Sequence, residues 1–168
     1  MSKGRLLAFV DCNIMIAGMF VPMHPSKAIL IMASNKHLDL ITCAEVIEDI
    51  EDEIFAQAKE RNDYDLIEIC TQLIKQTRIK VLPNPPIELV KATNEKYLGI
   101  MRHKADIPVL ASAIEIGPNL ILSDNRKHFN NSVAERCGIR IFSSDEFLKG
   151  LITGTIGEQL QKQHYCHE

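Results

Sequence analysis

Acidic residues follow two of the most hydrophobic segments of this chain. Asp11 comes directly after the apolar run Leu6–Val10, and Asp124 follows Leu120–Leu122 in the stretch "LILSDN". A carboxylate beside a buried strand is costly to desolvate unless something compensates its charge. Mg²⁺ and Mn²⁺ are hard cations that prefer oxygen ligands and would relieve the repulsion between clustered carboxylates. Asp11 could also cap the next helix, and Ser-Asp-Asn is a common turn sequence.

A third acid, Asp106, stands before a helical segment in "KADIPVLASAIEI". Its position is that of a helix N-cap, and Pro108 falls in the first turn, where a missing N–H does no harm. Helix capping is the simpler interpretation of Asp106 taken alone. An N-cap Asp nevertheless leaves one carboxylate oxygen free, so the residue could cap a helix and bind a metal together.

The stretch "ITCAEVIEDIEDEIF" contains the fourth candidate acid. Thr42 and Glu45 have the spacing of a capping box, which would give Glu45 a structural role. Glu48 lies one helical turn further on and is the best candidate to turn back toward the strand ends. Spacing alone cannot choose it over Asp49 or Asp52.

The elements that must position these acids alternate along the chain. Predicted strands are Leu6–Val10, Leu38–Ile41, Lys80–Leu82, Leu120–Leu122 and Ile139–Phe142. Predicted helices are Ser26–Ser34, Ala44–Lys59, Asp65–Lys75, Ile87–Met101, Ile107–Ile116, Ser132–Arg136 and Asp145–Leu151. This alternation predicts βαβ units and a parallel α/β sheet. Such sheets bind ligands beyond the carboxyl ends of their strands, where the strand order reverses.

Composition narrows the class of protein. The chain has 168 residues, 46% of them hydrophobic, which suits a single domain, expected over residues 1–154 and followed by a polar tail over 155–168. A net charge of −3 excludes a global basic field, so a nucleic acid would have to bind a local patch. Five irregularly spaced cysteines are typical of reduced thiols. Because no segment approaches the ~20 apolar residues of a membrane helix, we expect a cytoplasmic protein without membrane contact.

The end of the chain, "HYCHE", contains His164, Cys166 and His167. These side chains could chelate a soft metal. A terminal tail without further ligands is more often an adventitious metal trap than a built site.

Taken together, the segments "FVDCNIMI", the acid Glu48 after a strand-ending Thr, "ADIPVLASAIE" and "LILSDNRKHF" resemble the successive motifs of PIN domains. The likeness is greatest to the toxin ribonucleases of prokaryotic toxin–antitoxin pairs (VapC-like proteins). The resemblance implies a three-layer α/β/α fold with a central parallel sheet in the order 3-2-1-4-5. It also implies a metal-dependent ribonuclease with an RNA substrate, an antitoxin partner and a possible homodimer.

Carried over residue by residue, the resemblance gives a ligand set for Mg²⁺ or Mn²⁺. It implies that Asp11, Glu48, Asp106 and the Asp124–Asn125 position serve as the metal-binding and catalytic acids. It makes Asn13 a polar neighbour and places Ser123 near a metal-bound water.

The sequence departs from the family pattern in two places. Spacing to the basic run "RKHF" puts Asn125 rather than Asp124 at the acidic position, although charge favours Asp124 as the ligand. Many family members also carry a second acid shortly before the position of Asp106, where this chain has Arg102, His103 and Lys104. Both changes remove negative charge, so the site could bind one metal ion rather than two.

Basic residues surround two of the acids. Arg102 and Lys104 flank Asp106, while Arg126, Lys127 and His128 follow Asp124. With Asn13, Ser123 and Asn125, these side chains could hold the backbone phosphates of RNA. Each basic residue taken singly is more simply explained as balancing acids on a solvated surface.

Two other classes of function stay open. The chain could be a catalytically degenerate PIN-like protein that binds RNA or serves as a scaffold. It could also be another phosphate-handling α/β domain, such as a phosphatase or a phosphotransfer receiver. Against a phosphatase, Asp11 is followed by Cys-Asn and not by an acid two residues on. Against a receiver, no paired acids precede a first helix, and the absence of a glycine-rich phosphate loop makes ATP binding unexpected.

Overall fold

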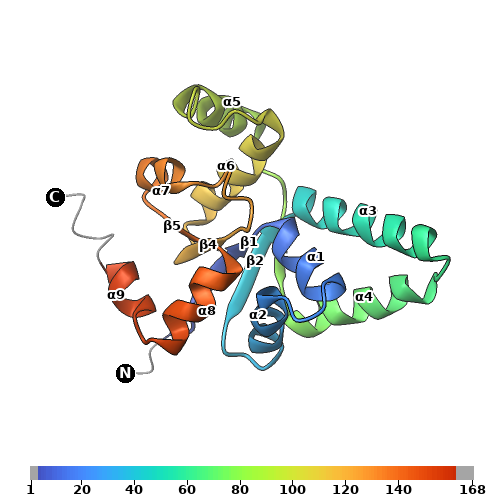
Figure 1. Ribbon diagram of the computed structural model, residues 1–168. Coiled ribbons are helices and arrows are strands. Elements are labelled where there is room, and N and C mark those ends of the chain that lie inside the picture. Colours follow the sequence, from blue (N-terminus) through green and yellow to red (C-terminus); the bar gives the residue numbers. More distant parts are fainter. Residues whose placement is uncertain (1–3, 162–168) are drawn as a thin grey trace.

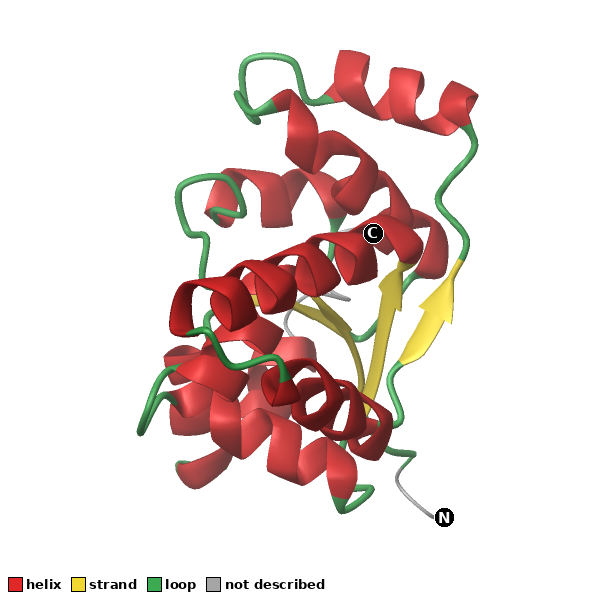
Figure 2. Cartoon of the chain, turned by 90° about the vertical axis from the view of Figure 1, so that its right-hand side faces the viewer, coloured by secondary structure: helices red, strands yellow, loops and turns green. Residues whose placement is uncertain are grey.

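Five short strands form one parallel sheet in the order β3-β2-β1-β4-β5 in the computed structural model, which describes residues 4–161. The strands are β1 (Leu7–Val10), β2 (Asp39–Cys43), β3 (Lys80–Leu82), β4 (Leu120–Leu122) and β5 (Arg140–Phe142). All four pairings are parallel, and the strands in view in Figure 2 point the same way. The strand order confirms the expectation, and it reverses beside β1, which lies between β2 and β4.

One group of helices packs together against one side of the sheet. It comprises α1 (Cys12–Phe20), α2 (Pro25–Ser34), α3 (Ala44–Arg61), α4 (Asp65–Thr77) and α8 (Ser144–Ile152). Helices α3 and α4 form a hairpin that leans on α1 and α2 (Figure 1). Gly18 allows α1 and α2 to approach closely, because a Cβ atom there would lie 2.6 Å from Leu30 Cδ1. α1 begins at Cys12, two residues after β1 ends at Val10.

The second group of helices lies on the other side of the sheet (Figure 1). It comprises α5 (Ile87–Lys96), α6 (Ile107–Ile116) and α7 (Asn131–Cys137), with the 3₁₀ turn η1 (Lys104–Asp106) leading into α6. α6 packs against β2 and α5, and α7 packs against β5. The three-layer α/β/α arrangement is the predicted one.

Most predicted elements are confirmed to within one or two residues, with three differences. The segment 12–20 forms α1, which the sequence did not predict as a helix because its apolar residues show no period. The predicted helix Ile87–Met101 ends at Lys96, and the chain then turns. Residues Ile156–Gln161, expected in the polar tail, form a short helix α9, and Ile156 is buried in the core.

The hydrophobic core is centred on β1 and β4, whose residues Ala8–Val10 and Leu120–Leu122 are fully buried. Cys12, Cys43, Cys70 and Cys137 are free thiols, while Cys166 and the rest of the "HYCHE" sequence lie outside the described residues. Within residues 4–161, no single helix is long and apolar enough to cross a membrane. Only the bent pair α1 and α2 has that length and composition together, with 99° between its two helices.

Candidate metal centre

The carboxyl ends of β1 and β4 bring the first candidate acid next to the turn after Leu122. The backbone N–H of Asp11 donates to Leu122 O at 3.0 Å, which continues the pairing of β1 with β4 past the last strand residue. On the other side, Thr42 Oγ1 donates to Val10 O at 2.9 Å. The end of β1 is therefore held from both neighbouring strands.

Asp11 is buried and accepts three hydrogen bonds. Its Oδ1 accepts from Cys12 N at 2.8 Å, and its Oδ2 accepts from Asn13 Nδ2 and Ser123 Oγ, each at 2.7 Å. A carboxylate offers about four lone-pair sites, so one site on Oδ1 is left for another partner. Asn13 in turn accepts from Asp124 N at 2.9 Å through its Oδ1. Asn13 and Ser123 thus orient Asp11, as polar neighbours of the acid.

Burial raises the pKa of Asp11, and the nearby charge of Asp106 raises it further. The hydrogen bonds from Ser123, Cys12 and Asn13 lower the pKa but do not offset the desolvation. Burial also raises the pKa of the Cys12 thiol to about 12, helped by the charges of Asp11 and Asp49. This pKa favours the neutral thiol form of Cys12 at this edge.

Asp106 occupies the N-cap position of α6, but its side chain makes no capping hydrogen bond. The prediction that it caps the helix through its carboxylate is wrong, and its carboxylate is free for another role. Its Oδ2 atom is buried and has no hydrogen-bond partner among the described residues. Its charge raises the pKa of Asp11, so the two carboxylates are close enough for their charges to interact.

The capping hydrogen bonds at the start of α3 differ from those predicted. The Thr42–Glu45 capping box is wrong: α3 has Cys43 as its N-cap without a side-chain cap, because the Thr42 hydroxyl bonds to β1. Asn84, from the proline-rich loop after β3, accepts instead from Glu45 N at 2.7 Å. The Glu45 carboxylate is half-buried, and this burial and the charges of Asp49 and Glu48 raise its pKa.

Among the α3 acids, Asp49 is the one whose charge is coupled to the sheet edge. Partial burial raises its pKa most, followed by the charges of Asp52, Glu48 and Asp106. Glu48, the residue favoured by the sequence, is exposed, as Asp49 is, and of the two it is Asp49 whose charge acts on the Cys12 thiol after β1. Spacing along the helix could not make this distinction, because both residues lie within one turn of Glu45.

The two residues that leave β4 point to different neighbours. The Asp124 carboxylate accepts from Ser144 N at 2.7 Å and from Ser144 Oγ at 2.9 Å, and its Oδ2 lies 3.8 Å from His24 Nε2. It therefore binds the first turn of α8. Asn125 instead donates its N–H to Ser123 Oγ at 3.2 Å and places its amide 3.0 Å from His128 Nδ1.

The basic side chains that were predicted to bind phosphates differ in their exposure and in their partners. Arg102, Lys104 and Lys127 are exposed and lie within two residues in sequence of His103, Asp106 or His128. Arg126 is engaged elsewhere, since its guanidinium donates to Ile141 O at 3.3 Å and lies 3.4 Å from Glu146 Oε2. It lines a cavity of about 420 Å³ between β5, α8 and α9.

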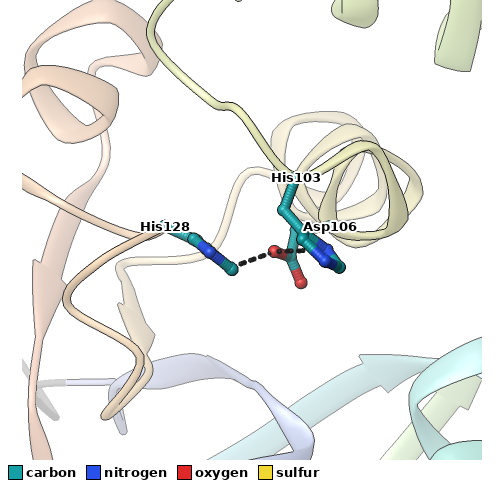
Figure 3. A group of neighbouring side chains, drawn as sticks. All are labelled: His103, Asp106 and His128. Carbon is teal, nitrogen blue, oxygen red and sulfur yellow. Dashed lines mark ion pairs between the residues drawn. The ribbon is translucent and has the colours of Figure 1, made fainter.

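Two histidines also lie at this site, and the sequence did not predict that they would be neighbours. His103 precedes η1 and His128 belongs to the turn after β4, and both imidazoles face the Asp106 carboxylate (Figure 3). Their rings are stacked, with centroids 4.9 Å apart and planes at 11°. The sequence indicated His128 only as a possible phosphate contact, and His103 only as a residue near the place where the resemblance expects a second acid.

The oxygen donors at the sheet edge fit a hard divalent cation. Asp11 has one lone pair left over, Asp106 has a buried oxygen without a hydrogen bond, and Asp49 adds a third charge nearby. Three carboxylates with raised or mutually coupled charge are stabilised when a cation joins them. Mg²⁺ and Mn²⁺ accept such a partial set because they keep several waters in their coordination shell.

Comparisons with known proteins establish the fold and no more. Protein-family models and curated sequences give no match. Among solved structures, the chain is similar to VapBC2 from Rickettsia felis, crystallised with a DNA fragment from its promoter: the TM-score is 0.59 and the identity 11%, over 82% of this chain and 98% of that one. It is also similar to PAE2754 from Pyrobaculum aerophilum, with a TM-score of 0.57 and 16% identity over 90% and 94% of the two chains. The chain has a PIN-like, VapC-like fold.

Proposed function

We propose that this protein is a metal-dependent ribonuclease that hydrolyses phosphodiester bonds of RNA. The observation that carries the proposal is the buried Oδ2 atom of Asp106, which has no hydrogen-bond partner in the described chain and shares a charged edge with Asp11. A buried carboxylate oxygen without a hydrogen bond is costly, and a cation is a partner that removes the cost. The VapC-like fold and the position of this edge at the reversal of strand order support the same reading.

In this proposal each residue has a separate task. Asp11 and Asp106 hold Mg²⁺ or Mn²⁺ directly, together with an acid of α3, Asp49 in the observed arrangement and Glu48 as the residue favoured by sequence. Asn13 and Ser123 fix the orientation of Asp11. When bound, the cation supplies an activated water and stabilises negative charge on the phosphoryl group.

We propose that the exposed cations Arg102, Lys104 and Lys127 hold the phosphates on either side of the cleaved bond. All three are exposed and neighbour His103, Asp106 or His128 in sequence, which supports a role in holding the RNA backbone. Arg126 is less suited to this task, because Glu146 and β5 already engage it. Asp124 is assigned to positioning, since it holds the start of α8.

The protein with the similar fold that was crystallised as VapBC2 is a complex bound to promoter DNA. We propose that this chain likewise acts as the toxin of a toxin–antitoxin pair, with a protein partner that restrains it. Co-expression of the neighbouring small gene product and co-purification of the two chains would test this part.

A second candidate is a degenerate PIN-like protein that binds RNA without cleaving it. It is favoured by one observation, that β4 delivers an amide, Asn125, toward the site while the acid Asp124 is bonded to Ser144. A reduced acid set could bind one cation weakly or not at all.

Cleavage of single-stranded RNA by the full chain with Mg²⁺ or Mn²⁺, and with EDTA, distinguishes the candidates. We expect metal-dependent cleavage that falls by about 10³-fold or more in Asp11→Asn and in Asp106→Asn, because removing a metal ligand removes most of the catalysis. Glu115→Gln, an exposed acid on α6, is the matched control and should cleave as the wild type does. RNA binding without cleavage would favour the degenerate protein, and cleavage that persists in Asp11→Asn would refute the proposed site.

A further inference from the structure

Two imidazoles enclose one carboxylate beside the Asp11 site. His128 Nδ1 lies 2.5 Å from Asp106 Oδ2, and His103 Nδ1 lies 3.7 Å from the same oxygen (Figure 3). One potential ligand atom from each of the three residues lies within 4.8 Å of the other two. These residues, His103, Asp106 and His128, form what we call the histidine cluster.

The polar groups of the histidine cluster do not satisfy one another. Asp106 Oδ2 accepts no aligned hydrogen bond from the described residues, although His128 Nδ1 is within reach. The same Nδ1 atom lies 3.0 Å from the amide nitrogen Nδ2 of Asn125, which is a donor. A ring nitrogen that accepts from this amide has no proton to give Asp106, so its lone pair faces a carboxylate lone pair. A cation placed between the two atoms would bind both.

We infer that the histidine cluster is a binding site for a transition-metal ion of the zinc class. Two imidazole nitrogens and one carboxylate oxygen are a ligand set typical of Zn²⁺ with a fourth position open to water. Mg²⁺ prefers an all-oxygen set, so this site discriminates between the two ions. Ligand atoms around a tetrahedral zinc ion lie about 3.4 Å apart, so the observed spacing needs shifts of about one ångström.

The side chains that must shift are accessible enough to do so. The His103 side chain is 62% exposed, and the His128 side chain is 20% exposed in a turn after β4. Asp106 is expected to shift least of the three residues, because it is the N-cap residue of α6. The ion would share Asp106 with the hard-cation site at Asp11, so the two sites are coupled.

This inference goes beyond the proposed nuclease, since it concerns a second kind of metal and does not require RNA cleavage. Asp11 contributes no ligand to the histidine cluster. A variant at Asp11 therefore separates the two sites, and a failure of one proposal does not decide the other.

Co²⁺ titration followed by visible absorption tests the site with the metal alone. The full chain carries other soft ligands near its end, so the background is the triple variant His164→Ala, Cys166→Ser, His167→Ala. In this background we expect one Co²⁺ per chain with the intense bands of a tetrahedral ion, displaced by one equivalent of Zn²⁺ and not by millimolar Mg²⁺.

Single substitutions locate the ion. His103→Gln and His128→Gln should each weaken Co²⁺ binding by about 100-fold or more, because even outer-shell partners of a metal change its affinity by about 10–100-fold. His37→Ala, an exposed histidine after α2, is the control and should bind Co²⁺ like the background variant. Asp11→Asn should keep the Co²⁺ bands.

Several outcomes would overturn the inference. One is a Co²⁺ titration of the background variant that gives no tetrahedral bands. Another is full Co²⁺ affinity in His103→Gln. Because the His103 side chain is exposed, this variant should fold even if His128→Gln unfolds. Loss of the bands in Asp11→Asn would place the ion at the acidic edge instead. Retained Co²⁺ binding in a protein that fails to cleave RNA would refute only the proposed function.

Discussion

At the scale of single residues, the Asp11 carboxylate is buried and its charge is only partly compensated. Three donors from Cys12, Asn13 and Ser123 hold its carboxylate, yet burial still raises its pKa. The donors therefore orient the group without fully offsetting the loss of water. The nearby charge of Asp106 adds to the imbalance and does not relieve it.

Because a bound cation would offset this charge, its binding should stabilise the folded chain. At a Mg²⁺ concentration 100 times its Kd, the free energy of unfolding should rise by ~2.7 kcal/mol, because the ion binds the folded chain alone. Asp11→Asn should lose most of this rise, since an amide binds Mg²⁺ less strongly than a carboxylate. Differential scanning calorimetry with Mg²⁺ and with EDTA measures both, with Glu115→Gln as the control. An equal rise in Asp11→Asn would place the ion elsewhere.

The acids of α3 can be ranked by a matched set of substitutions. Asp49→Asn should weaken Mg²⁺ binding by about tenfold, because the charge of Asp49 is coupled to Asp106 and to Cys12 at the sheet edge. Glu45→Gln and Glu48→Gln should each change the affinity by less than about twofold, since their charges are not among those that act on Asp11 or Cys12. Isothermal titration calorimetry gives the three constants. A large loss in Glu48→Gln alone would restore the choice made from the sequence.

At the scale of elements, the turn after β4 divides its two polar residues between two tasks. Consecutive residues leaving a strand point in different directions, and the sequence favoured Asp124 over Asn125 as the metal ligand because of its charge. Asp124 accepts from both polar groups of Ser144, and the carboxylate stands at the N-terminus of α8, where the helix dipole favours negative charge. Asn125 lies beside His128.

Asp124→Ala should therefore act on stability and not on metal binding. We expect the free energy of unfolding to fall by about 1.5–3 kcal/mol, the range for hydrogen bonds to a charged group. The Mg²⁺ affinity should stay within about twofold of the wild type. Asp145→Ala on the same helix removes an exposed ion pair with Lys149 and should cost about 0.5 kcal/mol or less. Urea unfolding of the two variants gives the comparison, and a small loss in Asp124→Ala would contradict this assignment.

Asn125→Asp tests the other half of the turn. A carboxylate at this position would add a charge beside the histidine cluster and Asp106. Because affinity for hard cations rises with ligand charge, Mg²⁺ binding should strengthen by about tenfold. RNA cleavage should increase with it. An unchanged affinity, measured by calorimetry, would show that the Asn125 side chain does not reach the ion.

At the scale of the whole molecule, the sequence predicted the sheet better than the site. Short β-branched and leucine-rich runs between helical patterns mark the strands, and their order followed from the resemblance to a known fold. α1 was missed because "CNIMIAGMF" is apolar on all sides and shows no helical period. The Thr42–Glu45 capping box failed because Thr42 found a backbone acceptor on a strand distant in sequence, Val10 O. Such tertiary partners cannot be read from local spacing.

Tyr97 offers a test of the packing of the whole fold that is independent of any metal. Its side chain is fully buried at the end of α5, and its hydroxyl has no hydrogen-bond partner in the described chain. Burial raises its pKa from 10.0 to about 12, and the charge of Cys137 adds to the rise. Above its ordinary pKa the unfolded chain loses this proton while the folded chain keeps it. The stability of the wild type should therefore fall as pH rises through the range between these two pKa values.

Tyr97→Phe removes both the orphan hydroxyl and its ionisation. At pH 7 the free energy of unfolding should rise by about 1 kcal/mol, because a buried group without a partner is replaced by an apolar one of the same shape. The advantage of the variant over the wild type should then grow between about pH 10 and 12, the window set by the two pKa values. Urea unfolding of both chains at several pH values measures this difference, and groups common to both chains cancel from it. Tyr64→Phe, at a side chain that is 55% exposed, is the control and should show no such growth. A loss of stability in Tyr97→Phe at pH 7 would mean that the hydroxyl has a partner in solution, and the core around α5 and α6 would then be more polar than the structure describes.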